Sequence, residues 1–242
     1  MKRTERHHLK DNELARMAIS ARQVVEERRT QLAAIVIGVV VILAVVGGYF
    51  AWTGRVSARA NALLADAMAI DGARVGPPPA PGSPAPGGLN FETVRAKHQA
   101  ALTKFKIVAD EYPKSDAGIF AAYRLAATYM ALGEASSAAT IYQQVIDRAG
   151  SGMFGQVARL GLAEAQAETG QYEQAIATFK DLAQQKDGRV PVDGVLLRLG
   201  RTCLDAGKTG DAEQAFNRIV NEFPDSPFIA DARRELDQLK KT

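Results

Sequence analysis

The feature that most constrains this chain is an uncharged apolar run of 21 residues, from Leu32 to Trp52. A helix of that length, rising 1.5 Å per residue, spans about 30 Å, which matches the hydrocarbon core of a bilayer. Valine and isoleucine would favour a strand in water, but a lone strand in lipid leaves its backbone groups unpaired, so we expect a helix. The sequence therefore predicts one transmembrane anchor over residues 32–52, with a long buried core helix as the alternative.

The net charge of the chain is concentrated before this run. Residues 1–31 hold eight of the 30 Lys and Arg residues and five of the 27 Asp and Glu residues, so the remainder carries 22 of each and is neutral. A neutral domain lacks the positive field that holds polyanions, which argues against nucleic-acid binding. The positive-inside rule places the basic tail in the cytoplasm and the larger domain outside it, even though Arg55 and Arg59 follow the run.

Residues on either side of the run bear on processing and on the tail. Residues 58–60 resemble a signal-peptidase site, but the run exceeds the 7–15 apolar residues of a signal peptide, so we expect an uncleaved anchor. Apolar residues recur at helical spacing between Asp11 and Arg29 and predict an amphipathic helix in the tail. This helix could lie on the inner leaflet, dock on a cytoplasmic partner or simply be solvated.

Beyond residue 91 the sequence repeats every 37 residues. In the second helix of each of four units, alanine is followed four positions later by an aromatic residue and three positions after that by an aliphatic one. Positions i and i+4 share a helix face, so the alanine admits a neighbouring helix while the ring fills the space between units. A glycine five positions before the alanine predicts a turn between antiparallel helices in the last three units. The columns are Ala101, Ala138, Ala175 and Ala212; Phe105, Tyr142, Phe179 and Phe216; Val108, Val145, Leu182 and Ile219; and Gly133, Gly170 and Gly207.

These columns resemble the tetratricopeptide repeat family over residues 57–242. The resemblance implies an all-α solenoid of about four helix pairs, ended by a polar capping helix within residues 226–241. A Pro- and Gly-rich insertion at residues 74–90 interrupts the first unit, and its six prolines are expected to prevent both helix and ladder there. The third unit departs from the family pattern, with Arg159 at an expected bulky position and Gln166 at an expected aromatic one.

No residue pattern in the sequence points to catalysis. The chain has no G-x-S-x-G, HExxH, CxxC or phosphate-binding glycine loop. Outside the tail the only histidine is His98, expected on the outer part of a helix. The only cysteine is Cys203, at an inner position where a small apolar residue fits, and a single cysteine excludes an internal disulfide. We therefore expect a protein that is not an enzyme and that needs neither cofactor nor metal.

The family resemblance implies instead a binding groove lined by the first helices of the units. Several matching positions carry apolar residues where solvent is expected, which is typical of an interaction surface. The alternative is that the segment after the membrane run folds back and fills the groove. The candidate groove residues are Phe120, Tyr123, Ala127, Met130, Val157, Leu160, Glu164, Ala167, Leu197, Arg201 and Leu204.

The order of tail, span and repeats resembles the layout of the bacterial inner-membrane YfgM-like proteins, ancillary subunits of the SecYEG translocon. The resemblance implies a periplasmic repeat domain, partners in the translocon and among periplasmic chaperones, and a role in handling exported proteins. As an alternative, the turns at 111–117 and 222–228 resemble those of periplasmic repeat proteins of outer-membrane assembly and division, which favours a cell-envelope organiser. A third option is an enzyme regulator whose basic tail contacts a cytoplasmic partner.

Overall fold

The structure is a computed structural model that describes residues 29–77, 88–185 and 188–241. The chain divides into two compact units, residues 1–55 and 56–242. The predicted amphipathic tail helix lies outside the described residues.

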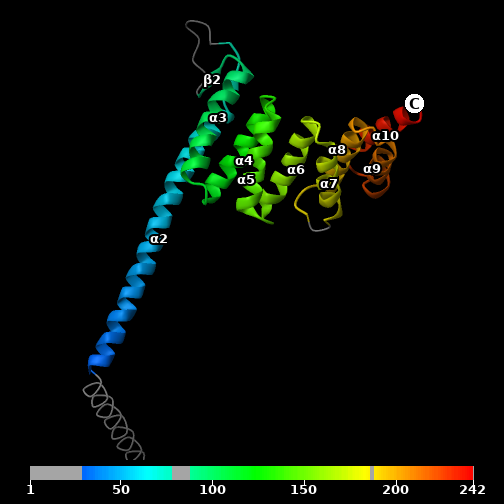
Figure 1. Cartoon of the computed structure of the whole chain (residues 1–242). Coiled ribbons are helices and arrows are strands. Elements are labelled where there is room, and N and C mark those ends of the chain that lie inside the picture. The colour runs from blue at the N-terminus through cyan, green and yellow to red at the C-terminus, as the bar shows by residue number, and fades with distance from the viewer. Residues whose placement is uncertain (1–28, 78–87, 186–187, 242) are drawn as a thin grey trace, which may run out of the picture. The chain divides into compact units, whose positions relative to one another are not determined.

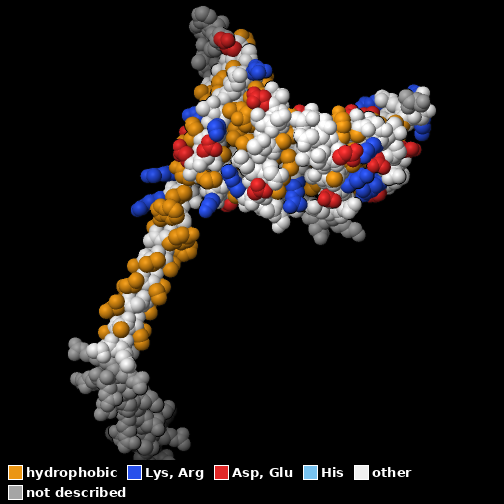
Figure 2. All heavy atoms as spheres, in the orientation of Figure 1, with side chains coloured by type: hydrophobic (Ala, Val, Ile, Leu, Met, Phe, Trp, Pro, Cys, Tyr) orange, Lys and Arg blue, Asp and Glu red, His pale blue; other side chains and the backbone are white. Residues whose placement is uncertain are grey.

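The first described element is the long helix α2, Arg29–Asp71, which contains the predicted membrane run. Among the described residues it is the one helix long and apolar enough to cross a membrane. Large apolar side chains from Ile35 to Trp52 are 44% to 68% exposed, and they cover this part of the helix in Figure 2. The structure therefore does not bury the run as a core helix would be buried.

Helix α2 also continues beyond the predicted boundary. The sequence suggested a separate helix after the membrane run, but the helix is unbroken from Arg29 to Asp71. Residues 53–56 contain no proline, and the single Gly54 only weakens a helix without ending it. The hydroxyl of Thr53 donates a hydrogen bond to the Phe50 carbonyl, which is compatible with a helical backbone.

The expectation that no ladder forms within residues 74–90 is wrong at the two ends of the insertion. Strand β1, Arg74–Val75, pairs in parallel with β2, Asn90–Phe91. The backbone N–H groups of Arg74 and Gly76 and the side-chain amide of Asn90 donate hydrogen bonds across this pair. These positions are free of proline, so their donors remain available. The ladder holds the two ends of the insertion together.

The prediction of an all-α solenoid is confirmed by the helices that follow. They pack in sequence order, each against the next, as the row of helices in Figure 1 shows. The last part of α2 and helix α3 form the first pair, and α4–α5, α6–α7 and α8–α9 form the next three. The bounds are α3, Val94–Glu111; α4, Asp116–Ala131; α5, Ala135–Ala149; α6, Met153–Glu168; α7, Tyr172–Gln184; α8, Val192–Asp205; α9, Thr209–Glu222; and α10, Ile229–Leu239.

The repeating alanines and aromatic residues lie in the core of this solenoid. All four alanines of the column are 0% exposed, and the aromatic residues are at most 4% exposed. Tyr142 and Phe216 rest on glycines of first helices, where an added Cβ at Gly161 or Gly200 would lie 2.3 Å from a ring carbon. The helices therefore approach as closely as the rings allow.

The repeated glycines end the first helices in a left-handed turn. Gly133, Gly170 and Gly207 have φ angles of 81°, 78° and 72°. At Gly170 the glycine N–H donates to the Ala167 carbonyl and the next N–H donates to the Gln166 carbonyl. This is the Schellman pattern, which satisfies the last carbonyls of a helix, and the other two glycines repeat it.

Helix α10 ends the stack because its sequence follows the first-helix pattern only in part. Leu236 lies 37 residues after Leu199 and is buried, as is Ala232. In α8, Gly200 and Cys203 face α9. The equivalent positions 37 residues later are Asp237 and Lys240, and both are exposed. Charged residues at these positions offer no seat for another helix.

We expect Gly170→Ala to lower the free energy of unfolding by about 1–2 kcal/mol, because a Cβ strains a left-handed backbone. No atom lies within 4 Å of the new Cβ, so the effect isolates backbone strain. Urea denaturation of the full chain in detergent measures it. Gly210→Ala, in equally open space but without a positive φ, should cause no loss. Equal losses of unfolding free energy in both variants would show that the left-handed backbone at Gly170 is not the cause.

We expect Gly161→Ala to lower the free energy of unfolding by about 1–3 kcal/mol through overpacking against the Tyr142 ring. Thermal unfolding of the full chain in detergent measures the change. The same substitution in a Tyr142→Leu background should cost less, because the ring that it meets is gone. Strictly additive losses would show that the two residues do not meet.

Candidate functional site

The predicted groove residues lie on α4, α6 and α8, the first helices of units two to four, and together form what we call the first-helix face. Most of them are half-buried, so they remain accessible in part. Leu197 differs because it is only 5% exposed and belongs to the hydrophobic core. Arg201 is the most exposed member, with 47% of its side chain exposed. The segment after the membrane run packs as the first helix of the stack, with Ala67 in the core beside residues of α3 and α4.

Successive first helices contact one another at a separation of 34 residues. The Phe120 and Phe154 rings lie 5.6 Å apart, and Glu164 forms an ion pair with Arg198. The last junction repeats the spacing, since Arg201 is 3.5 Å from Glu235. This separation is three residues shorter than the 37-residue repeat, which is about one helical turn. Each first helix is therefore displaced along the next by about one turn. In the sequence, this contact is visible only as opposite charges 34 positions apart. The columns of the 37-residue repeat did not reveal it.

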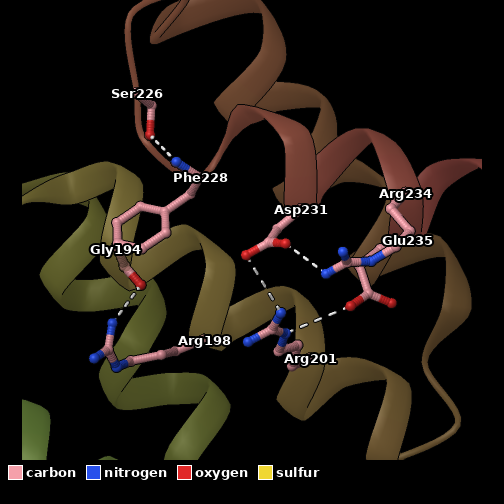
Figure 3. A network of polar contacts seen from close by, with 8 residues as sticks. All are labelled: Gly194, Arg198, Arg201, Ser226, Phe228, Asp231, Arg234 and Glu235. Atoms are coloured by element: carbon pink, nitrogen blue, oxygen red, sulfur yellow. Dashed lines mark hydrogen bonds and ion pairs between the residues drawn. The ribbon is translucent and has the colours of Figure 1, made fainter.

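Ion pairs cover the C-terminal part of the first-helix face. Arg198 bonds Glu164 and donates a 3.0 Å hydrogen bond to the Gly194 carbonyl. Arg201 lies between Asp231 and Glu235, at 3.8 and 3.5 Å (Figure 3). Figure 2 shows side chains of both charges gathered over the C-terminal helices. These pairs are partly solvated, so each contributes about 0–1 kcal/mol and acts mainly on orientation.

The start of α10 closes the same end of the face. The Phe228 ring lies over Gly194, where an added Cβ would be 3.3 Å from the ring (Figure 3). The Ser226 hydroxyl donates to the Asp193 carboxylate at 2.7 Å and accepts from the Phe228 N–H. Phe228 and Gly194 are again 34 residues apart. The capping helix thus uses the same register as the repeats.

The N-terminal part of the face is aromatic and apolar. The Tyr123 ring lies 6.0 Å from that of Tyr142, which itself rests on Gly161. Burial raises the pKa of the Tyr142 hydroxyl well above its usual range, and nearby Tyr123 and Glu164 add to the effect. The hydroxyl is therefore neutral at physiological pH. Ala127 and Met130 continue the half-buried stripe along α4.

Arg124 lies beside this stripe and joins three helices. Its guanidinium pairs with Asp71 at the end of α2 and lies 5.8 Å from the centre of the Phe105 ring on α3. The Asp71 side chain is 15% exposed and that of Arg124 is 31% exposed. The charge of Arg124 is thus engaged by a carboxylate and an aromatic face.

Two clefts lie apart from the first-helix face. A cleft of about 240 Å³ opens between α5, α6 and α7 and includes Arg159 and Leu162. A more open one of about 540 Å³ lies among the turns around Pro191 and Pro224. Neither is lined by a predicted groove residue, although Leu182 of the repeat columns lines the first.

The described residues offer no obvious chemistry. No three His, Cys, Asp or Glu side chains among them could hold a metal ion. His98 is half-buried rather than fully at the surface, and its Nδ1 is buried without a hydrogen-bond partner. Cys203 is 0% exposed, and burial, helped by the Asp211 carboxylate, raises the pKa of its thiol. A buried, protonated thiol is a poor nucleophile.

Comparison with protein families and with solved structures gave matches to tetratricopeptide repeats. A family model described as "Tetratricopeptide repeat-like domain" matches residues 29–240. A structure of nearly identical TPR-like repeats from a kinesin light chain candidate of Podosopora anserina is 16% identical, with a TM-score of 0.52 over 60% of this chain and 79% of that chain. A tetratricopeptide repeat protein from Parabacteroides merdae is 15% identical, with a TM-score of 0.49 over 61% of this chain and 55% of that chain. Comparison with curated proteins gave no match.

We expect the thiol of Cys203 to resist a disulfide-exchange reagent such as Ellman's reagent at pH 8 while the chain is folded. The reason is that Cys203 is fully buried and its pKa is raised. Absorbance of the released thiolate measures the reaction, and addition of guanidinium should release one equivalent. A fast reaction of the folded chain would contradict this placement.

Proposed function

The chain belongs to the family of tetratricopeptide repeat-like domains, and from that premise we propose that it is a membrane-anchored protein that binds other proteins through its first-helix face. The fold itself is that of a protein–protein interaction module and is typically a non-enzymatic scaffold. The observation that carries the proposal is the row of aromatic and apolar side chains on α4, above all Tyr123 and Met130, which pack against the core but are only partly buried. Such a row costs free energy in water unless a partner covers it.

The exposed apolar part of α2 supports the membrane anchor. A helix that is apolar on all sides and bare of protein contacts is unfavourable in water and favourable in lipid. Tyr49, Phe50 and Trp52 form one aromatic group, with ring centres 6.0 and 6.5 Å from Tyr49. Rings of this kind favour the headgroup level. The charge asymmetry of the sequence supports a cytoplasmic tail and an extracytoplasmic repeat domain.

The layout supports a role beside the protein-export channel. Like the YfgM-like proteins that it resembles, the chain combines a short tail, one span and a tetratricopeptide-like domain. We therefore assign it to the bacterial inner membrane, with SecYEG and periplasmic chaperones as partners and exported proteins as clients.

The alternative function, a cell-envelope organiser, draws on the turns at 111–117 and 222–228. In the structure, the serines of these turns form local hydrogen bonds. The hydroxyl of Ser115 accepts from the Gly118 N–H and caps α4, and that of Ser226 accepts from the Phe228 N–H. Since local hydrogen bonds account for the serines in both turns, these serines do not favour either partner, and the export role is preferred.

A photoreactive phenylalanine analogue at Tyr123, in the full chain in its native membrane, tests the proposal. We expect ultraviolet light to link it to translocon subunits or periplasmic chaperones. The matched control carries the analogue at Gln144, which is exposed on the second helix α5, and should give little of either product. Equal labelling from both positions, or none of these partners from Tyr123, would refute the proposal.

A further inference from the structure

The charges of the first-helix face are already neutralised within the fold. Glu164 is paired with Arg198, and Arg201 with Asp231 and Glu235. Beside the face, Arg124 is paired with Asp71. A ligand carboxylate that approached one of these arginines would have to displace a carboxylate that is already held in place. Such an exchange gains little free energy, because one ion pair only replaces another.

One junction between first helices lacks such a pair. One pair of equivalent repeat positions, 34 residues apart, falls at each of three junctions: 164 with 198, 201 with 235, and 127 with 161. The first two pairs hold Glu with Arg and Arg with Glu, but the third holds Ala127 and Gly161. Between α4 and α6 the face therefore offers an uncharged gap in an otherwise charged series.

The side chains around these two positions are mostly apolar, although Glu164 and Arg124 lie near the Tyr142 hydroxyl. Tyr123, Ala127 and Met130 lie on one stripe of α4 and are half-buried, and Tyr142 fills the floor against Gly161. Phe120 extends the stripe and contacts Phe154 of α6. From Phe120 to Met130 the stripe runs ten residues, or about 15 Å of helix. That length matches four or five residues of an extended chain, or about ten residues of a helix.

We infer that this gap, the apolar window formed by Phe120, Tyr123, Ala127 and Met130, binds short uncharged apolar stretches of unfolded polypeptide and does not read a charged chain end. The inference rests on the proposed function and specifies its ligand. Recognition is by burial of apolar side chains, so affinity should depend weakly on salt. A free terminal carboxylate on the ligand should make no difference.

An array of 15-residue peptides tests this, with apolar content and net charge varied independently and each peptide made as free acid and as amide. The full chain in lipid nanodiscs is applied, and the signal of empty nanodiscs is subtracted. We expect binding to follow apolar content, to be equal within about twofold for acid and amide, and to survive 500 mM salt.

Two variants locate the site. Ala127→Glu places an unpaired charge in the window, at a position where units three and four already carry Glu164 and Arg201, so the fold should tolerate it. We expect it to weaken binding at least about tenfold, because apolar contact would then bury a lone charge. Gln144→Glu, which adds the same charge on the exposed side of α5 and outside the first-helix face, is the matched control and should change binding less than about twofold. Arg201→Gln tests separately whether the face reads a charge. Circular dichroism should show that all three variants remain folded.

The outcomes separate the two proposals. If no peptide binds above the nanodisc background, the proposed function fails together with the inference. If binding needs the free acid, falls with salt and is lost in Arg201→Gln, the inference fails and the proposed function stands. If Ala127→Glu binds as well as the original chain, the window is not the site and the inference also fails.

Discussion

The close approach of helices over small residues is the constraint on which the rest of this structure depends. Four alanines of the second helices are fully buried, and the rings of Tyr142 and Phe216 rest on Gly161 and Gly200. Contacts this tight fix the displacement of one unit on the next. That displacement produces the 34-residue register between first helices, which in turn decides which side chains meet on the first-helix face. The proposed binding surface is thus a consequence of this packing.

The sequence predicted the parts of the fold that follow from the 37-residue repeat. It missed the parts that depend on how far one first helix is displaced along the next. The alanine, aromatic and glycine columns recur every 37 residues, so helices, turns and capping helix could be located. The offset between neighbouring first helices leaves no column, so the pairing of Glu164 with Arg198 could not be read from the repeat. The ladder at Arg74 was missed for a similar reason, because its partner Asn90 lies beyond six prolines. The candidate groove residues lie on first helices, as expected, but the core position of Leu197 depends on neighbours outside its own repeat.

Helix α6 is where the two halves of the solenoid core meet. Its fully buried positions hold only alanine and glycine, and the buried residues fall into two clusters, one shared by α2 to α6 and one by α6 to α10. On the side of the second helices Leu162 is half-buried and lines a cleft, whereas its counterparts Leu125 and Leu199 are buried. Gly161 of α6 leaves room for the Tyr142 ring and brings no charge to its own place on the neighbouring face. The division of the core at α6 and the apolar window are therefore products of the same composition.

A window of four side chains on one helix implies weak binding, and the proposed anchor makes weak binding sufficient. Burial of a few half-exposed apolar groups, at roughly 25 cal/mol per Å², must first offset the entropy that the partner loses. A site fixed to the membrane meets chains emerging there at a high effective concentration, so low affinity still gives occupancy. Low affinity also lets each stretch leave again, as is needed when the bound chain must go on to fold. The neutral charge balance of the repeat domain fits the same purpose, since it adds no long-range attraction that would retain a client.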